Sequence, residues 1–436
     1  MKKTNFICGT LEGFYGRPWK ISDRHQLFQW MHDWAGMNTY MYAPKDDLYH
    51  RSKWRELYPD PLYQELKELV ASCKQKELQF IYAIAPGLDM GYSDKNDWNH
   101  LIHKINQVRS MGCDHFAILF DDIPVELSDS DLKEFSSFAE AHAYITNRLY
   151  GNLQESDSDS SLIFCPTVYC GRMADYDVLG NAYLSELGQL LNKDIGFFWT
   201  GPEVVSQKIS VESIQELRQV IRRKPIIWDN IHANDYDIRQ MFFGPYSGRS
   251  FELKKELSGI LSNPNCQFWA NYIPLKTLAI YCSINNKWNP RQAYLNSFSE
   301  WMQYFGNDEL SEKELILLGD CFYLPGQMGE IGNQLLECID HIMTTDPDHW
   351  GHYVDALKEI ETTLNSLCMK LMAATNRDLL YDFYLVLWEL KEEMENISNW
   401  IKWKLSGHDE FKSMDFVPRR QGILYEIQQK GYHEEN

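Results

Sequence analysis

The chain has 436 residues, which is more than one ordinary domain holds and suits a barrel-sized unit with a smaller partner. Hydrophobic residues make up 44% and charged residues 24%, so the chain can bury a sizeable core and is a soluble globular protein by composition. The 62 acidic and 42 basic residues give a formal net charge of -20, which repels phosphate backbones and anionic lipid surfaces. We therefore expect neither nucleic acid nor membrane as a partner, and no apolar run reaches the ~20 residues of a membrane-spanning helix.

The first 290 residues alternate between strand-like and helix-like segments. Short apolar, β-rich runs recur eight times, at 5–13, 39–44, 79–87, 115–122, 161–169, 194–201, 225–230 and 266–272. Helix-like segments lie between them, for example 23–36 and 61–76. This alternation predicts an α/β fold with a closed (β/α)₈ TIM-like barrel over 1–290, and an open doubly wound sheet is the alternative.

The strand signal ends after Asn289 and Pro290, and the pattern becomes helical. Ser311 and Glu314 have the spacing of a capping box at the start of a helix. The sequence therefore predicts an α-helical bundle over 291–436, which follows the barrel as a second domain.

One long helix of this bundle should carry a continuous apolar seam, at Leu380, Phe383, Leu387, Leu390, Met394, Ile397 and Ile401. Trp388, Trp400 and Trp403 lie off that seam. They either pack on a neighbouring helix of the same chain or mark an interface between two copies. The second alternative predicts a homodimer through the helical domain.

The ten cysteines are scattered and none has the paired CxxC spacing of zinc or redox motifs, so we expect reduced thiols and a cytoplasmic or nuclear location. At the amino end, the apolar stretch after Met1 to Thr4 is interrupted by Gly9 and Glu12. We therefore expect no signal peptide.

Catalytic groups of a parallel barrel stand at the carboxyl ends of its strands. Carboxylates, amides, aromatic side chains and one lysine end or follow the predicted strands: Glu12, Lys45, Asp46, Asp47, Asp89, Asp121, Asp122, Tyr169, Trp228, Asp229, Asn230, Asn271 and Tyr272. Aromatic faces stack on sugar rings, while Asp and Asn exchange hydrogen bonds with hydroxyl groups. This rim is typical of a site for a neutral, polyhydroxylated ligand.

The most informative element is the apolar run 116–120, which ends in the adjacent carboxylates Asp121 and Asp122. Neighbouring carboxylates titrate as a coupled pair, with one member poised as an acid. Adjacent residues cannot flank a glycosidic bond at the about 5 to 9.5 Å that paired glycosidase carboxylates need, but they suit a 2-acetamido sugar that supplies its own nucleophile. Alternatively, one Asp caps a helix while the other forms a structural ion pair.

A metal site is the other use of paired Asp, but no cluster of His or Cys accompanies the pair, so no metal and no cofactor is expected. The other rim residues also have structural alternatives. Lys45 could be a solvated loop lysine, Asn230 and Asp235 could shape a turn, and Tyr169 and Trp228 could be core aromatics.

Seven motifs, in chain order, resemble those of the O-GlcNAcases of glycoside hydrolase family 84. They are EGFYGRPW at 12–19, YAPKDD at 42–47, IAPGLD at 84–89, LFDD at 119–122, CPTVYC at 165–170, WDNIHANDYD at 228–237 and NPNCQFWANY at 263–272. In the helical domain, NRDLLYDFY at 376–384 and Trp388 resemble the stalk domain of this family.

The resemblance implies a β-N-acetylglucosaminidase that acts on O-GlcNAc-modified Ser and Thr of intracellular proteins, by a substrate-assisted retaining mechanism through an oxazoline. Asp121 would orient and polarise the acetamido N–H, while Asp122 would protonate the leaving oxygen and then activate water. The sugar contacts and pocket residues that the resemblance implies are Gly13 through its backbone, Lys45, Tyr169, Trp228, Asn230, Asp235 and Asn271.

The resemblance also implies that two chains pair through their bundles and that Trp388 helps to line a peptide groove. The terminal helix, around 419–430, would then cross to the other subunit. Animal members of the family carry a long insertion between barrel and stalk and an acetyltransferase-like domain, and we expect this chain to lack both. Two other hypotheses remain at this point: a sugar-binding barrel without turnover, and a metal-dependent hydrolase.

Overall fold

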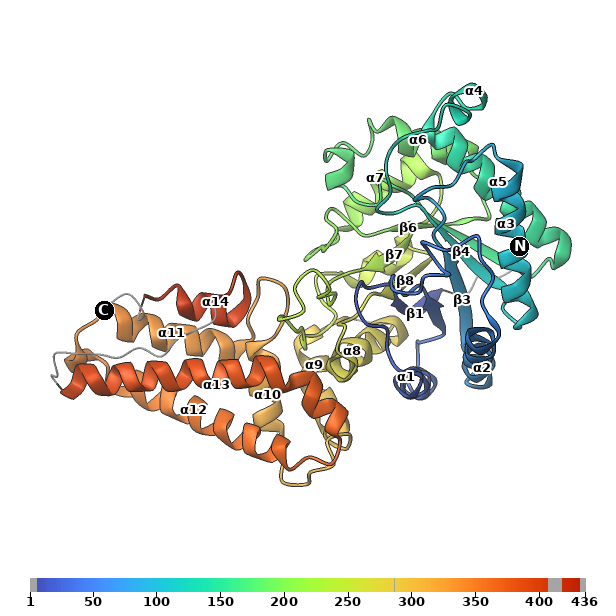
Figure 1. Ribbon diagram of the computed structural model, residues 1–436. Helices are drawn as coiled ribbons and strands as arrows, with labels where there is room; N and C mark the ends of the chain where they lie inside the picture. The colour runs from blue at the N-terminus through green and yellow to red at the C-terminus, as the bar shows by residue number, and fades with distance from the viewer. Residues whose placement is uncertain (1–5, 286, 407–417, 432–436) are drawn as a thin grey trace. The chain divides into compact units, whose positions relative to one another are not determined.

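Eight short parallel strands close into a barrel in the computed structural model, which describes residues 6–285, 287–406 and 418–431 (Figure 1). The strands are β1 (Ile7–Glu12), β2 (Thr39–Tyr42), β3 (Gln79–Ile84), β4 (His115–Leu119), β5 (Ser161–Cys165), β6 (Gly196–Trp199), β7 (Ile226–Asp229) and β8 (Gly259–Ser262). Because β8 pairs with β1, the sheet is closed and the doubly wound alternative is wrong. The residues Met1 to Thr4, weighed above for a signal peptide, lie outside the described part.

Helices follow the strands, and all but the last of them lead on to the next strand. They are α1 (Ile21–Asp33), α2 (Asp60–Gln75), α3 (Lys95–Ser110), α4 (Asp131–Glu134), α5 (Phe138–Ser156), α6 (Ala182–Leu190), α7 (Val211–Ile221) and α8 (Tyr272–Ser283). The first two confirm the helices expected at 23–36 and 61–76. In α2, Pro61 stands in the first turn, where its missing N–H is not needed, and Leu66, Leu69 and Val70 are buried.

The strands are buried on both faces. Five of the six residues of β3 are buried, and the barrel interior is filled by side chains such as Leu11, Met41, Ile81, Leu119 and Leu261. Because helices cover the outside and side chains fill the inside, each strand is a nearly continuous apolar run. This explains why the sequence pattern located the first seven strands.

The eighth predicted strand, at 266–272, is wrong. The true β8 lies earlier, and residues Phe268–Asn271 form the 3₁₀ helix η3, after which α8 begins at Tyr272. The segment Phe268–Asn271 is rich in apolar residues because it is packed in the interior as a 3₁₀ helix, although it does not belong to the sheet. The residue that follows β8 is therefore Asn263.

Contacts between residues divide the chain into two units, each with its own interior. The first comprises Met1–Asp235, Tyr246–Cys266 and Leu278–Trp288, and the second comprises Tyr236–Pro245, Gln267–Thr277 and Asn289–Asn436. The segments Tyr236–Pro245 and Gln267–Thr277, the second of which holds η3 and the start of α8, precede the predicted boundary at residue 290, yet their contacts assign them to the second unit.

The second unit is helical after Asn289, with α9 (Pro290–Met302), α10 (Glu312–Cys321), α11 (Glu330–Thr344), α12 (Gly351–Met372), α13 (Arg377–Ser406) and α14 (Gly422–Gln428). Asn289 caps α9 by accepting a hydrogen bond from the Gln292 N–H at 3.1 Å. Ser311 and Glu314 form the expected capping box of α10. The helix expected around 419–430 is α14, which packs on α11 of the same chain.

Helix α13 has one buried and one exposed face. All seven residues of the predicted seam are buried, which confirms that seam. Trp400 is buried and stacks on Trp350, with ring centroids 5.8 Å apart, so it packs within the chain. Tyr381, Tyr384 and Leu385 are exposed and Trp388 is half-buried; at spacings of three, four and seven residues these four form one row, the α13 stripe.

All ten cysteines carry free thiols, and eight of them are buried. Burial raises the pKa of the Cys113 and Cys321 thiols to about 12. No helix within the described ranges is long and apolar enough to span a bilayer.

Candidate active site

Asp121 and Asp122 follow β4 and have different partners. Asp121 is buried, whereas Asp122 is exposed and its backbone is left-handed, with φ of 51°. Neither caps a helix, since the next one, α4, begins at Asp131. An Asp tolerates this backbone better than most residues, because its short polar side chain interacts with the local backbone.

Asp121 forms an ion pair with Lys45, which stands three residues past β2. The Lys45 Nζ donates to Asp121 Oδ2 at 2.5 Å, and the Lys45 side chain is 3% exposed. Burial opposes the charged form of Asp121, but the Lys45 ammonium outweighs it and lowers the pKa of this carboxyl. Asp121 is therefore ionised at neutral pH, and Lys45 is not a solvated loop lysine.

The other oxygen of Asp121, Oδ1, is buried and has no hydrogen-bond partner among the described residues. Such an atom is unfavourable unless a ligand satisfies it. An ionised carboxylate with one vacant acceptor can receive an N–H from a bound molecule.

Two tyrosine hydroxyls hold the carboxylate of Asp122. Tyr169 donates to Oδ1 at 2.9 Å and Tyr15 donates to Oδ2 at 3.0 Å. Burial and the adjacent Asp122 carboxylate raise the pKa of Tyr169, so this hydroxyl keeps its proton. Because Asp122 is exposed, it can exchange a proton with water or with a bound ligand. The two carboxylates thus differ in environment, which suits two chemical roles.

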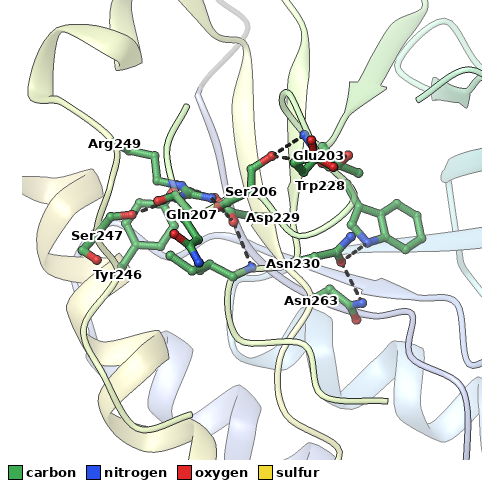
Figure 2. A network of polar contacts seen from close by, with 12 residues as sticks. Glu203, Ser206, Gln207, Trp228, Asp229, Asn230, Tyr246, Ser247, Arg249 and Asn263 are labelled. Atoms are coloured by element: carbon green, nitrogen blue, oxygen red, sulfur yellow. Dashed lines mark hydrogen bonds and ion pairs between the residues drawn. The ribbon is translucent and has the colours of Figure 1, made fainter. Parts of the chain in front are cut away.

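A second group of residues links the ends of β1, β7 and β8; Figure 2 labels its members Trp228, Asn230 and Asn263. The Trp228 indole N–H and the Asn263 side-chain amide both donate to Asn230 Oδ1, each at 3.0 Å. Asn263 Oδ1 accepts from the Gly13 backbone N–H at 3.3 Å. Gly13 also lies against the indole, since a Cβ there would stand 2.5 Å from the Trp228 ring. These contacts make Gly13, Trp228, Asn230 and Asn263 one connected polar and aromatic wall.

Asp229, the last residue of β7, supports this wall and is a structural residue. Its carboxylate accepts from Arg249 Nε at 2.8 Å and Nη2 at 2.7 Å, and from the Tyr246 hydroxyl at 2.9 Å (Figure 2). Both charges are fully buried. Because Asp229 lies between Trp228 and Asn230, this ion pair fixes the backbone from which both side chains extend.

Lys45 and Tyr15 connect the two groups. The Lys45 Nζ lies 5.8 Å from the ring centroid of Trp228 and 5.8 Å from that of Tyr15. Asp235 joins through the Tyr15 backbone N–H, which donates to its Oδ2 at 2.8 Å. The structure thus brings together most of the predicted site residues: Gly13, Lys45, Asp121, Asp122, Tyr169, Trp228, Asn230 and Asp235.

Two predicted residues lie in the second unit. Asn271 ends η3 and is fully buried, and its side-chain amide donates to the Gln267 carbonyl at 2.9 Å. The prediction that Asn271 ends the eighth barrel strand is wrong, because that strand, β8, ends at Ser262. Trp388 lies on α13, with its ring 5.0 Å from that of Tyr384.

The sequence reasoning missed Tyr15, Arg51 and Asn263. Asn263 would have been found from the correct end of β8, and Tyr15 lies inside the EGFYGRPW motif. No sequence signal marks Arg51. Among the residues with described positions, no group of three or more His, Cys, Asp or Glu is arranged to hold a metal ion.

Comparison with known proteins relates this barrel to one enzyme family. Residues 8–317 match a family model described as β-N-acetylglucosaminidase. The protein O-GlcNAcases of Mus musculus and Rattus norvegicus are each 48% identical over 280 residues, which is 64% of this chain and 30% of either relative. The match therefore spans less than a third of the length of these relatives.

Solved structures resemble nearly the whole chain. A mutant of the Thermobaculum terrenum O-GlcNAc hydrolase superposes with a TM-score of 0.82 at 27% identity, over 99% of this chain and 89% of that one. A structure of CpGH84B gives a TM-score of 0.78 at 24% identity, over 99% of this chain and 72% of that one. The second likeness concerns the fold alone.

Proposed function

The chain belongs to the β-N-acetylglucosaminidase family, and from this premise we propose that it removes O-linked N-acetylglucosamine from Ser and Thr side chains of proteins. The observation that carries the proposal is the pair Asp121 and Asp122, two adjacent carboxylates with different partners at the end of β4. The 48% identity to protein O-GlcNAcases over 280 residues supports the choice of substrate.

In the first step the substrate supplies its own nucleophile. The acetamido carbonyl oxygen attacks the anomeric carbon, a new C–O bond closes an oxazoline ring, and the bond to the Ser or Thr oxygen breaks. Asp121 Oδ1 accepts the acetamido N–H and so increases the electron density on the attacking oxygen, while Lys45 keeps Asp121 ionised. Asp122 donates its proton to the leaving oxygen.

In the second step, water attacks the same carbon and reopens the oxazoline. Asp122, now ionised, takes the proton of this water, and the acetamido group regains its original form. Two inversions at one carbon give net retention of configuration. This sequence needs no carboxylate on the opposite face of the sugar.

We assign the sugar contacts to the wall described above. Lys45 and Asp235 present charged groups to sugar hydroxyls, Gly13 and Asn230 line the same side, and Trp228 and Tyr169 enclose the acetamido group. Asn271, which the resemblance implies, stays a proposed sugar contact, and Asn263 holds the wall together through its hydrogen bonds with Gly13 and Asn230.

Hydrolysis of an aryl β-N-acetylglucosaminide by the purified chain tests the activity. Retention of configuration by NMR and strong inhibition by a sugar-fused thiazoline, a stable mimic of the oxazoline, are the expected results. Covalent trapping of a 2-fluoro sugar on an Asp or Glu, without thiazoline inhibition, would contradict this mechanism.

The two carboxylates differ in their expected dependence on the leaving group. Asp122→Asn should lose about 10²- to 10⁴-fold in kcat/KM on substrates with poor leaving groups but much less on activated aryl glycosides, which hardly need protonation. Asp121→Asn should slow both substrates alike, because every substrate uses the acetamido group. Equal losses for both variants on both substrates would refute this division of roles.

We also propose that two chains pair through their helical units, that Trp388 helps to bind the peptide, and that the enzyme acts in the cytoplasm or nucleus. The exposed α13 stripe supports the first two proposals, since exposed apolar rows favour interaction. The ten free thiols support the third, since a reducing compartment preserves them.

A further inference from the structure

We propose that Arg51 is a positioning residue for Asp122 and acts mainly through the hydroxyl of Tyr15. This inference rests on the function proposed above, in which Asp122 exchanges the proton. Arg51 lies in the segment between β2 and α2, six residues after Lys45.

Three contacts form a closed ring around Asp122. Arg51 Nη1 donates to the Tyr15 hydroxyl at 2.8 Å, and this hydroxyl donates to Asp122 Oδ2 at 3.0 Å. Arg51 Nη2 donates to the Asp122 backbone carbonyl at 3.2 Å, so the ring returns to the same residue. The guanidinium also lies 5.4 Å from the centroid of the Tyr15 ring.

This ring fixes the direction of the Tyr15 proton. A tyrosine hydroxyl has one proton, and it can give this proton to Asp122 or to water. Arg51 can only donate, so the hydroxyl must accept from Arg51 and its proton points to Asp122 Oδ2. A hydroxyl that accepts from a cation is also a stronger donor, because hydrogen bonds in a chain polarise one another.

Asp122 needs such support more than a buried acid would. It is exposed, its backbone is left-handed, and Tyr15 itself is 42% exposed. Without Arg51, water can compete for the Tyr15 hydroxyl and the carboxyl group loses one of its two fixed partners. The carboxyl then spends less time in the orientation that reaches the leaving oxygen.

A different interpretation gives Arg51 a charge effect on Asp121. Arg51 is one of the cations that favour the ionised form of Asp121, together with the nearer Lys45. The two interpretations differ in one observable. A defect at Asp122 depends on the leaving group, whereas a defect at Asp121 does not.

The experiment measures kcat and KM of Arg51→Gln, Tyr15→Phe and the double variant on two substrates. One is an activated aryl N-acetylglucosaminide, and the other is phenyl N-acetylglucosaminide, whose phenolate is a poorer leaving group. Lys53→Gln is the matched control, because Lys53 carries the same charge two residues away and pairs with Glu56 at 3.7 Å on the surface. Melting temperatures establish that all variants fold.

We expect Arg51→Gln to lower kcat on the phenyl substrate by about 10- to 100-fold, a part of the full general-acid contribution, and to change the activated substrate by less than about threefold. Tyr15→Phe should give a similar pattern, and the double variant should lose little more than the larger single loss. Arg51→Lys should restore part of the rate, since it keeps one donor. Lys53→Gln should match the wild type on both substrates.

Three results would overturn the inference. An equal loss on both substrates would place the effect of Arg51 at Asp121, and a rise in KM alone would make Arg51 a substrate-binding residue. If the fold-loss in kcat of the double variant equalled the product of the two single fold-losses, Arg51 would not act through Tyr15. A wild-type chain that hydrolyses neither substrate would overturn the proposed function together with this inference, whereas the other results leave that function intact.

Discussion

Lys45 decides the charge of Asp121, and this gives a pH prediction. Burial alone would raise the pKa of Asp121, but the Lys45 ammonium lowers it below its ordinary value. The ionised pair therefore stabilises the fold above the ordinary pKa of Asp, and this contribution is lost as pH falls through the lowered pKa. Without Lys45, Asp121 should take up a proton at higher pH.

We therefore expect Lys45→Met to move the acidic limb of the kcat/KM profile to higher pH, besides lowering the maximal rate. The measurement is the rate on an activated aryl substrate between about pH 3 and pH 8, in the range where carboxyl groups titrate. Lys45→Arg, which keeps a cation, should retain the acidic limb at its wild-type position. An unmoved limb in Lys45→Met would show that Asp121 does not depend on Lys45.

Gly13 is required by space rather than by backbone conformation. An added Cβ would stand 2.5 Å from the Trp228 ring and 2.6 Å from Leu11. Gly13→Ala should therefore displace the indole, reduce kcat/KM and lower the free energy of unfolding by about 1–3 kcal/mol, as overpacking does.

Urea unfolding and steady-state kinetics measure both effects of Gly13→Ala. Gly151→Ala is the control, because Gly151 lies in α5 with no atom within 4 Å of an added Cβ. This change should stabilise by up to about 1 kcal/mol, since Ala favours helix, and should leave kinetics unchanged. Gly13→Ala with wild-type kinetics would show that the indole does not shape the pocket.

The site residues that could be predicted are those next to apolar strands. Asp121, Asp122 and Trp228 adjoin such runs, so their place at the barrel rim follows from the strand pattern. Tyr15 and Arg51 lie in loops, and their contacts with Asp122 join residues 107 and 71 positions apart. Nothing local in the sequence indicates such contacts, so only the closed barrel could reveal them.

At the scale of elements, the order of strands and helices could be predicted but the last strand could not. β8 contributes only two large apolar side chains, Ile260 and Leu261, whereas the run 266–272 is longer and rich in aromatics. Both β8 and the run 266–272 are buried and therefore rich in apolar residues. A short buried helix cannot be distinguished from a buried strand by periodicity. The expected end of the eighth strand therefore fell at Asn271 and Tyr272, whereas β8 ends at Ser262.

The end of β7 depends on the buried ion pair of Asp229 and Arg249. Arg249→Met should destabilise the chain by about 3–5 kcal/mol, because it leaves the Asp229 carboxylate buried without its cation. The activity that remains in the folded protein should fall as well, since Trp228 and Asn230 flank Asp229.

Urea unfolding of Arg249→Met is compared with Arg172→Met. Arg172 pairs with Glu203 at 3.5 Å, and its side chain is 56% exposed. Loss of this surface pair should change the free energy of unfolding by less than about 1 kcal/mol. If the free energy of unfolding changed by a similarly small amount in both variants, Asp229 would not depend on Arg249, because it would have found another partner or taken up a proton at little cost.

At the scale of the whole molecule, the exposed α13 stripe gives a prediction about assembly. If two chains pair through this face, Leu385→Asp should place a charge in the interface and yield monomers. Leu385 is 52% exposed in one chain, so the variant should fold as stably as the wild type.

Light scattering at micromolar concentration measures this assembly. We expect twice the mass of one chain for the wild type and the mass of one chain for Leu385→Asp, because an obligate interface above ~2,000 Å² survives dilution. Leu132→Asp, at a 62% exposed position on α4, is the control and should remain dimeric. A wild type with the mass of one chain would contradict the dimer.

The presence of two units could be predicted from the loss of the strand pattern near residue 290, but which segments belong to each unit could not. Segments 236–245 and 267–277 follow barrel strands in the sequence, yet their contacts assign them to the helical unit. Composition does not distinguish a segment that packs on its own barrel from one that packs elsewhere. Such assignments depend on long-range contacts.

The buried thiols also make the chain a convenient object for chemical labelling. Maleimide reagents attack the thiolate, and burial suppresses this form, as in Cys113, Cys321 and Cys368, whose pKa values are raised to about 12. A cysteine introduced at the exposed Lys53 would therefore react far faster than these native thiols at neutral pH. A fluorophore could then be attached two residues from Arg51 without first replacing those three cysteines.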